Sequence, residues 1–412
     1  MGIVIFIVGL LAALGTILTY LPPKPDLVSS IVFTIGWLTS ELSLQLAFVL
    51  SGGWLIVAFT VGIHGGLAII GSGLLAAAVL GDLGLYVIAH QSAQAVKNAL
   101  QSATPEPIPL DPSHLAPRYG NLVRRTLALP LPLRTVKVVK DIDYVGDGRK
   151  HHRLDVYFSK AESNSPLRPV LLYIHGGAWV IGDKREQAKP MLFELAARGW
   201  LCLSVNYSLS PKATWPEHVV DCKRAIAWAK DHVADFGGDP SLIVLAGGSA
   251  GGHLASLCAL TPGAPEFQPG FESEDTAVQG CVSIYGVLEM TGDKESSGRH
   301  GDAMLHLLER QVMKTTLANE RAKFEGASPL HRMTPSAPPF LVLQGRNDTL
   351  VPVEVARQFV RRYRATATAR CVYVELPFAQ HAFDIFSSPR CTATTAGVVA
   401  FVEQLRRDAA VG

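Results

Sequence analysis

Charged residues are scarce at the start of this 412-residue chain, and their scarcity divides the chain into two parts. The chain holds 37 basic and 35 acidic residues, yet within residues 1–96 the only charged ones are Lys24, Asp26, Glu41 and Asp82. The remainder carries charge close to the ~25% that is usual in soluble proteins. This composition excludes collagen, intrinsic disorder and a small disulfide-stabilised scaffold. We therefore expect a membrane-like first part and a soluble-like second part.

Two further absences narrow the function. The formal net charge is only +2 and the basic residues are scattered, which argues against nucleic acid as a partner. The six cysteines form no CxxC pair, so the sequence predicts no zinc site, and apolar neighbours favour buried free thiols. We expect neither a metal nor another cofactor.

Three apolar runs predict a multi-pass helical membrane region over residues 1–97. Residues 2–21 are uncharged and long enough to cross a hydrocarbon core of about 30 Å as one helix. The second run extends from residue 27 to about 50 and the third from 54 to about 80, with Gly52-Gly53 as a break.

Some features of this region have two interpretations. Residues 2–21 could be a cleaved signal peptide, although the basic segment and the cleavage site of one are not evident. Residues 83–97 either extend the third helix or lie at the membrane interface. Glu41 and His64 are candidates for function because ionisable groups are costly at membrane depth. The alternative places Glu41 near an interface and hydrogen-bonds His64 to another helix.

Basic residues favour the cytoplasm for the second part of the chain. Three spans place Lys24 on the same side as that part, whereas four spans would reverse this relationship. The positive-inside tendency then rests on Lys97, Arg118, Arg124 and Arg125.

Residues 98–135 form a predicted linker, because seven prolines exclude a long helix or a central strand there. From Val136 onward, short apolar runs alternate with helical patterns. Such alternation predicts an α/β fold with a mostly parallel sheet covered by helices on both faces, and residues 136–412 are long enough for one large domain. The expected strands are 136–144, 153–158, 169–174, 200–206, 242–246, 278–285, 340–344 and 371–376.

A nucleophilic serine is predicted at Ser249, within the pattern G-x-S-x-G. The motif follows an apolar strand-like run and opens a helical one, which is the strand–turn–helix context of a nucleophile elbow. A serine hydroxyl also needs stabilisation of the oxyanion that forms when it attacks an acyl carbonyl. His175-Gly176-Gly177 follows another strand, and we expect the amides of Gly176, Gly177 and Ala250 to donate to that oxyanion. His175 itself is expected to organise this loop.

The acid and the base follow in chain order. Asp348 comes just after the strand at 340–344, and His381 comes after the strand at 371–376. The order Ser249, Asp348, His381 is that of the α/β-hydrolase triad. Glu375 and Asp384 are weaker candidates for the acid.

Residues 136–412 resemble the hormone-sensitive-lipase-type carboxylesterases of the α/β-hydrolase superfamily and bacterial esterases with arylformamidase-like sequences. The matching segments are YIHGGAW, SVNYSLSP, DPSLIVLAGGSAGGHLA, PPFLVLQGRNDTLVP and QHAF. The resemblance implies Ser249 as nucleophile, His381 as base and Asp348 as the orienting acid. Ala178 stands where many relatives have a third glycine, which argues against esters of bulky tertiary alcohols.

The sequence thus predicts a membrane-anchored serine carboxylesterase that acts on small-molecule or lipid esters through an acyl-enzyme. An amidase or arylformamidase would use the same triad, and a non-catalytic membrane-tethered module is a third alternative. Residues 287–336 form an insert that either caps the pocket or is a surface excursion. The apolar first part of the chain is expected to determine where the ester chemistry takes place and not how it takes place.

Overall fold

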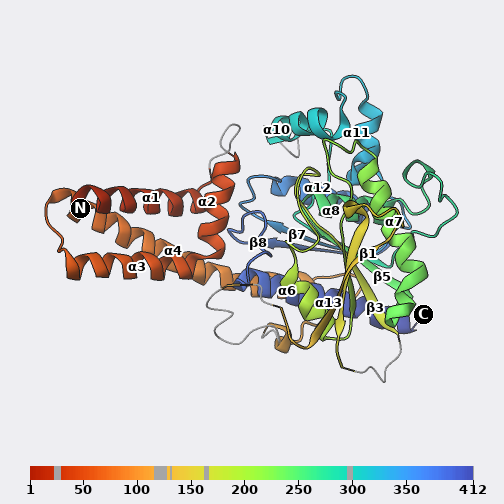
Figure 1. Ribbon diagram of the computed structural model, residues 1–412, viewed down its shortest axis with the longest axis horizontal. Coiled ribbons are helices and arrows are strands. Elements are labelled where there is room, and N and C mark those ends of the chain that lie inside the picture. Colours follow the sequence, from red (N-terminus) through yellow and green to blue (C-terminus); the bar gives the residue numbers. More distant parts are fainter. Residues whose placement is uncertain (23–28, 116–127, 130–131, 162–166, 295–299, 412) are drawn as a thin grey trace.

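The computed structural model describes the chain except residues 23–28, 116–127, 130–131, 162–166, 295–299 and 412. It has two parts, an elongated bundle of helices and a larger α/β body (Figure 1). Four of the basic residues used above for orientation, namely Lys24, Arg118, Arg124 and Arg125, lie outside the described residues.

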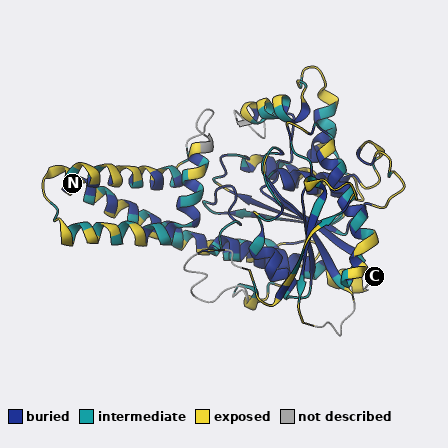
Figure 2. Cartoon of the chain, viewed as in Figure 1, coloured by how far each residue is buried: buried dark blue, intermediate teal, exposed yellow. Residues whose placement is uncertain are grey.

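Four helices build the bundle: α1 (Gly2–Tyr20), α2 (Ser29–Glu41), α3 (Ser43–Thr60) and α4 (Gly66–Gln101). Helices α1, α3 and α4 are long and apolar enough to cross a membrane. They lie side by side, while the shorter α2 crosses their ends next to the body (Figure 1). Figure 2 shows exposed residues along the outer faces of the bundle. The exposed apolar side chains of its helices include Leu11, Phe59 and Leu80, at 63%, 86% and 70% exposure. Such apolar exposure suits contact with lipid.

Within the described residues, three helices are candidates for spanning a membrane, as expected, but their boundaries differ from the predicted ones. The predicted second run is divided at Leu42 into α2 and α3, and α3 continues through Gly52-Gly53. An apolar environment favours this continuity because it leaves backbone groups no water to bond. The break falls instead at Gly62 and Gly65, which both adopt positive φ values that suit glycine. Residues 83–97 extend the last helix.

Helix α4 is about 54 Å long at 1.5 Å per residue, well beyond a hydrocarbon core of about 30 Å. Its final turns enter the body, where Val96 and Leu100 are buried in the same apolar cluster as Val398 and Val399 of α13 (Pro389–Val411). The bundle and the body therefore share a hydrophobic core.

The body contains one eight-stranded sheet of order β1-β2-β4-β3-β5-β6-β7-β8. The pairs β1–β2 and β2–β4 are antiparallel, and the neighbours from β4 through β8 are parallel. The α/β prediction is confirmed, and most strands begin and end within two residues of their predicted positions. The exception is β5, which begins at Gly238, four residues before its predicted start. The strands are β1 (Val136–Asp143), β2 (Arg153–Ser159), β3 (Arg168–Ile174), β4 (Leu201–Val205), β5 (Gly238–Gly248), β6 (Gly280–Ile284), β7 (Phe340–Gly345) and β8 (Cys371–Leu376).

Helices cover both faces of the sheet, and each face has its own apolar cluster. One cluster includes buried residues of α7 (Glu217–His232), α8 (Ala250–Leu260) and α12 (Val353–Thr366). The other includes those of α6 (Lys189–Ala197) and α13. No helix was predicted from the sequence at α6, because its nine residues are too few to give a clear helical period of apolar residues.

The insert at 287–336 leaves the sheet beside the predicted nucleophile, since the Val287 amide lies 3.5 Å from the Ser249 carbonyl. Its described part contains α10 (His300–Leu307), a π-helical turn (Leu308–Met313) and α11 (Arg321–Ala327). Trp215 donates its amide proton to the Val312 carbonyl at 3.0 Å, so the insert packs against the body. A role for it as a cap stays a prediction.

Candidate active site

Ser249 occupies a sharp turn between β5 and α8. Its backbone has φ 57° and ψ −122°, a conformation that costs a non-glycine residue on the order of 1–3 kcal/mol. The surrounding turn depends on glycine, because a Cβ on Gly251 would lie 2.0 Å from the Ile174 carbonyl oxygen. Ser249 also precedes the first residue of α8, so the Ala250 amide lies at the positive end of the helix dipole. This geometry is that of a nucleophile elbow.

The loop after β3 lies directly against this serine. A Cβ on Gly176 would be 3.0 Å from Ser249 Cβ. His175 is buried and its Nδ1 lies 2.7 Å from the Gly176 carbonyl, while its ring stacks on Tyr207 with centroids 4.5 Å apart. Burial lowers the pKa of His175 to about 4. A neutral, internally bonded imidazole organises the loop, as expected for this residue.

One expected oxyanion donor is already occupied. The Gly176 amide donates to Gln187 Oε1 at 2.8 Å, and this bond takes the proton that the sequence analysis assigned to an oxyanion. Within the described part of the chain, no hydrogen bond is found from the amides of Gly177 and Ala178. Among the described residues of this loop, the free amides therefore include those of Gly177 and Ala178, whereas that of Gly176 is taken.

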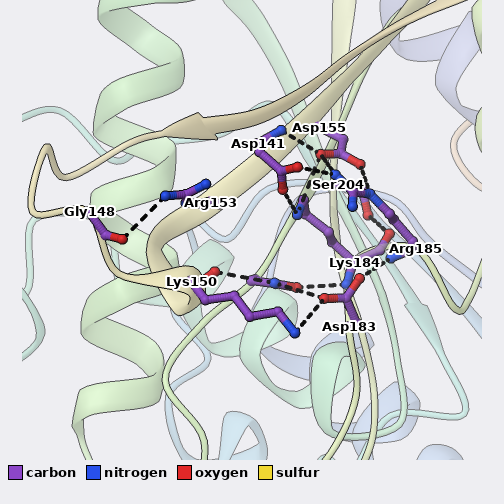
Figure 3. A network of polar contacts seen from close by, with 10 residues as sticks. Asp141, Gly148, Lys150, Arg153, Asp155, Asp183, Lys184, Arg185 and Ser204 are labelled. Atoms are coloured by element: carbon purple, nitrogen blue, oxygen red, sulfur yellow. Dashed lines mark hydrogen bonds and ion pairs between the residues drawn. The ribbon is translucent and has the colours of Figure 1, made fainter.

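The charged residues Lys184 and Arg185, which shortly precede Gln187 in the chain, attach their segment to the sheet through ion pairs (Figure 3). Lys184 Nζ lies 2.8 Å from Asp141 Oδ1, and Arg185 Nε lies 2.6 Å from Asp155 Oδ2. Hydrogen bonds from Lys184 and then Arg185 lower the pKa of Asp141 to about 2. This network joins β1 and β2 to the segment that carries Gln187. This network was not predicted from the sequence. The cluster of polar and charged residues Asp183–Gln187, close after the glycine loop, is the sequence feature that could have indicated it.

Gln187→Leu is expected to lower kcat for a soluble ester about tenfold with little change in KM. The substitution removes the acceptor of the Gly176 amide and leaves a buried donor unpaired, so the loop shifts relative to Ser249. Steady-state kinetics per active site, titrated with a fluorophosphonate, measure this effect. An unchanged kcat would show that Gln187 does not hold the loop.

Asp348 and His381 lie at the carboxyl ends of β7 and β8 and are joined directly. His381 Nδ1 lies 2.7 Å from Asp348 Oδ2. The other carboxylate oxygen of Asp348 accepts the amides of Leu350 and Val351 at 2.9 and 2.8 Å. Both side chains are almost fully buried, and Gln380 Oε1 accepts the amides of Thr349 and His381, which connects the two loops. The carboxylate is thus fixed where it orients the imidazole.

Tyr285 connects this pair to the serine elbow. Its ring centroid lies 4.4 Å from that of His381, and a Cβ on Gly248 would be 3.0 Å from its ring. Its hydroxyl donates to Asp384, one of the two weaker acid candidates. The other, Glu375, is bonded to Arg357 on the outer side of the sheet edge. Of these three carboxylates, Asp348 is the one that the structure shows bonded to the His381 ring.

Three buried histidines besides His381 bear on the stability of the fold rather than on the chemistry of the site. Burial lowers the pKa values of His175, His218 and His253 to about 4. His253 of α8 lies between Trp179 Nε1, which donates to its Nδ1 at 3.2 Å, and the Ala327 carbonyl, 2.8 Å from its Nε2. Both of its nitrogens are satisfied only when the ring is neutral.

These three histidines are expected to leave thermal stability unaffected above about pH 6.5 and to lower it as the pH drops towards 4. Between about pH 6.5 and pH 4, these histidines bind protons in the unfolded chain but stay neutral in the folded one. The free energy of unfolding therefore falls by on the order of 3 kcal/mol for each ring by pH 4. Melting curves of the detergent-solubilised chain measure it. His253→Gln keeps one donor and one acceptor and should flatten the slope, whereas His232→Gln, at an exposed position, should not. A melting temperature that is constant down to pH 4.5 would contradict the assignment.

The BD-FAE family model matches residues 154–363, which is half of the chain and includes the strand β5, the elbow and Asp348. The chain belongs to the BD-FAE family. This places it among the α/β-hydrolases of the carboxylesterase type, as the resemblance implied.

Curated relatives of this family member include two mycobacterial proteins. The chain is 46% identical over 286 residues to "Probable carboxylic ester hydrolase LipM" of Mycobacterium tuberculosis, a match that covers 68% of this chain and 65% of LipM. It is 40% identical over 295 residues to "Esterase LipQ" of the same organism, covering 70% of this chain and 69% of LipQ. The match thus spans about two thirds of the length of each relative.

Solved structures share the fold. Esterase B of Lactobacillus rhamnosis, inhibited by a tributyrin phosphonate, superposes with a TM-score of 0.56 at 21% identity, covering 69% of this chain and 90% of that one. At this identity the likeness bears on the fold alone.

Proposed function

We propose that the chain is a serine carboxylesterase carried by membrane-spanning helices, with Ser249 as nucleophile, His381 as general base and Asp348 as the acid that orients it. The observation that carries this proposal is the 2.7 Å bond between His381 and Asp348 at the strand edge where the Ser249 elbow also lies. The names of the mycobacterial relatives, a carboxylic ester hydrolase and an esterase, support the same reaction.

In the proposed reaction His381 Nε2 removes the proton of Ser249 Oγ while the oxygen attacks the ester carbonyl. The oxyanion of the tetrahedral intermediate accepts hydrogen bonds from the amide N–H groups of Gly177, Ala178 and Ala250. Protonated His381 then donates to the departing alcohol, and an acyl-Ser249 ester results. A water molecule, deprotonated by His381, attacks this ester and releases the carboxylic acid and the free serine. Asp348 accepts a hydrogen bond from the Nδ1–H group of His381 throughout, remains ionised, and stabilises the imidazolium.

The membrane part of the proposal rests on α1, α3 and α4 and on their exposed apolar side chains. Three crossings place the amino terminus and the body on opposite sides of the bilayer. The positive-inside tendency favours the cytoplasm for the body. Protease protection in sealed inside-out and right-side-out vesicles tests this orientation. Cleavage of the body only in right-side-out vesicles would overturn it.

The hydrolytic activity is tested on the full chain in membranes. We expect labelling by a fluorophosphonate and turnover of p-nitrophenyl esters from acetate to octanoate. Formanilides, the substrates of an arylformamidase, are the comparison. Formanilide turnover above that of every ester would replace the esterase assignment, and absence of both activities and of labelling would overturn the proposal.

A further inference from the structure

Helix α2 contacts the loop that carries the predicted general base. Trp37 Nε1 donates to the Ala382 carbonyl at 2.9 Å, and its ring stacks on Phe386 with centroids 5.0 Å apart. One turn earlier on α2, Phe33 meets the His381 ring at 6.0 Å with an interplanar angle of 80°. The first helices of the chain therefore reach the histidine itself, beyond what an anchor requires.

A buried ion pair fixes the end of α2 against the same loop. Glu41 Oε1 and Arg390 Nη1 lie 3.0 Å apart, and both side chains are 0% exposed. Each member of the pair has a further partner, because Arg390 also donates to the Ser40 carbonyl at 3.0 Å and Ser388 Oγ donates to Glu41 Oε2 at 2.5 Å. Such a pair holds one geometry, since any displacement leaves a charge buried without a partner. Glu41 is thus buried against the body, and both interpretations of its place relative to the membrane stay predictions.

The loop that carries Asp348, the predicted acid, is held by α1, the helix that precedes α2 in the chain. Asn347, next to Asp348, donates its side-chain amide to the Thr19 carbonyl in the last turn of α1 at 3.1 Å. Gln380, which bonds the amides of Thr349 and His381, lies against α2, where a Cβ on Gly36 would be 3.4 Å from its Nε2. Both loops therefore rest on the bundle.

The histidine loop has a conformation that needs such support. Phe378 and Ala382 have φ values of 50° and 62°, which are costly for residues other than glycine. The hydrogen bond from Trp37 is to the carbonyl of Ala382, one of these two residues. On the other side, Tyr285 packs against the His381 ring. The imidazole lies between the body and α2.

We propose that α2 is a positioning element of the active site, in which Trp37 and Phe33 hold the His381 loop in its productive geometry. This inference rests on the proposed function. Under this proposal the apolar first part of the chain also affects how the ester chemistry takes place, contrary to the expectation from the sequence.

The test compares two tryptophans that each donate one indole hydrogen bond. Trp37 donates to the histidine loop, whereas Trp54 donates to Ser72 Oγ at 2.8 Å within the bundle. In the full-length chain, Trp37→Phe is expected to lower kcat for p-nitrophenyl butyrate about five- to tenfold, with KM within about twofold, because a misplaced base slows both chemical steps. Trp54→Phe should leave both constants within about twofold of wild type.

Rates are expressed per site titrated with a fluorophosphonate, so partial misfolding changes the number of sites and not kcat per site. If Trp37→Phe yields no folded protein, Phe33→Leu provides the measurement, with an expected loss of at least about threefold in kcat. Equal kcat per titrated site in wild type and in the Trp37 and Phe33 variants would overturn the inference. Failure of the proposed function is distinct, because wild type itself would then show neither labelling nor turnover.

Discussion

Ser249→Ala is expected to abolish fluorophosphonate labelling of the full chain and to lower p-nitrophenyl ester turnover by at least about 10⁴-fold. The hydroxyl oxygen forms the covalent bond in the proposed acyl-enzyme, and no neighbouring group replaces it at the elbow. The strained turn is retained, because alanine is no larger than serine and the glycines that allow the close packing at β3 are unchanged. The loss should therefore be chemical, with the melting temperature close to that of wild type.

Ser256→Ala is the matched control for this variant. Ser256 lies in the same helix and donates to the Gly252 carbonyl at 2.7 Å, away from the elbow. Its replacement should leave labelling and turnover within about twofold of wild type. Full labelling of the Ser249 variant at its usual rate would place the nucleophile elsewhere and remove the basis of the proposed mechanism.

The fold was predictable because local sequence patterns determine it. The strand at Cys371–Leu376 has its predicted bounds, and that at Phe340–Gly345 is one residue longer than expected. Parallel strands bring their carboxyl ends to one edge, so the chain order of Ser249, Asp348 and His381 was enough to predict that they gather there. The bond between Asp348 and His381 agrees with that expectation.

Features that depend on tertiary contacts were not predictable. Nothing local to Gly176 indicates that its amide is taken by a side chain eleven residues later. Likewise, Trp37 lies in an apolar run whose composition is typical of a membrane span, and its bond to a carbonyl 345 residues away has no sequence signature. The boundaries of α3 were misplaced because Gly-Gly is a breaker in water but is tolerated in an apolar helix.

Asp348→Asn is expected to lower kcat about 10³- to 10⁴-fold while KM for p-nitrophenyl butyrate stays within about threefold. The carboxylate accepts a hydrogen bond from the Nδ1–H group of His381, which keeps the proton on Nδ1 and leaves Nε2 free to act as base. An asparagine held by the amides of Leu350 and Val351 would turn its NH₂ group towards His381 and favour the tautomer with Nδ1 unprotonated. The proton would then reside on Nε2, which could no longer accept one from Ser249.

Asp384→Asn separates this effect from the general loss of a buried carboxylate near the site. Burial raises the pKa of Asp384 to about 6, and the Tyr285 hydroxyl is its hydrogen-bond donor in place of His381. We expect this variant to lose less than about tenfold in kcat. If Asp384→Asn lost more activity than Asp348→Asn, the acid of the triad would be Asp384, and the 2.7 Å bond from His381 to Asp348 would have to be exchanged for another during turnover.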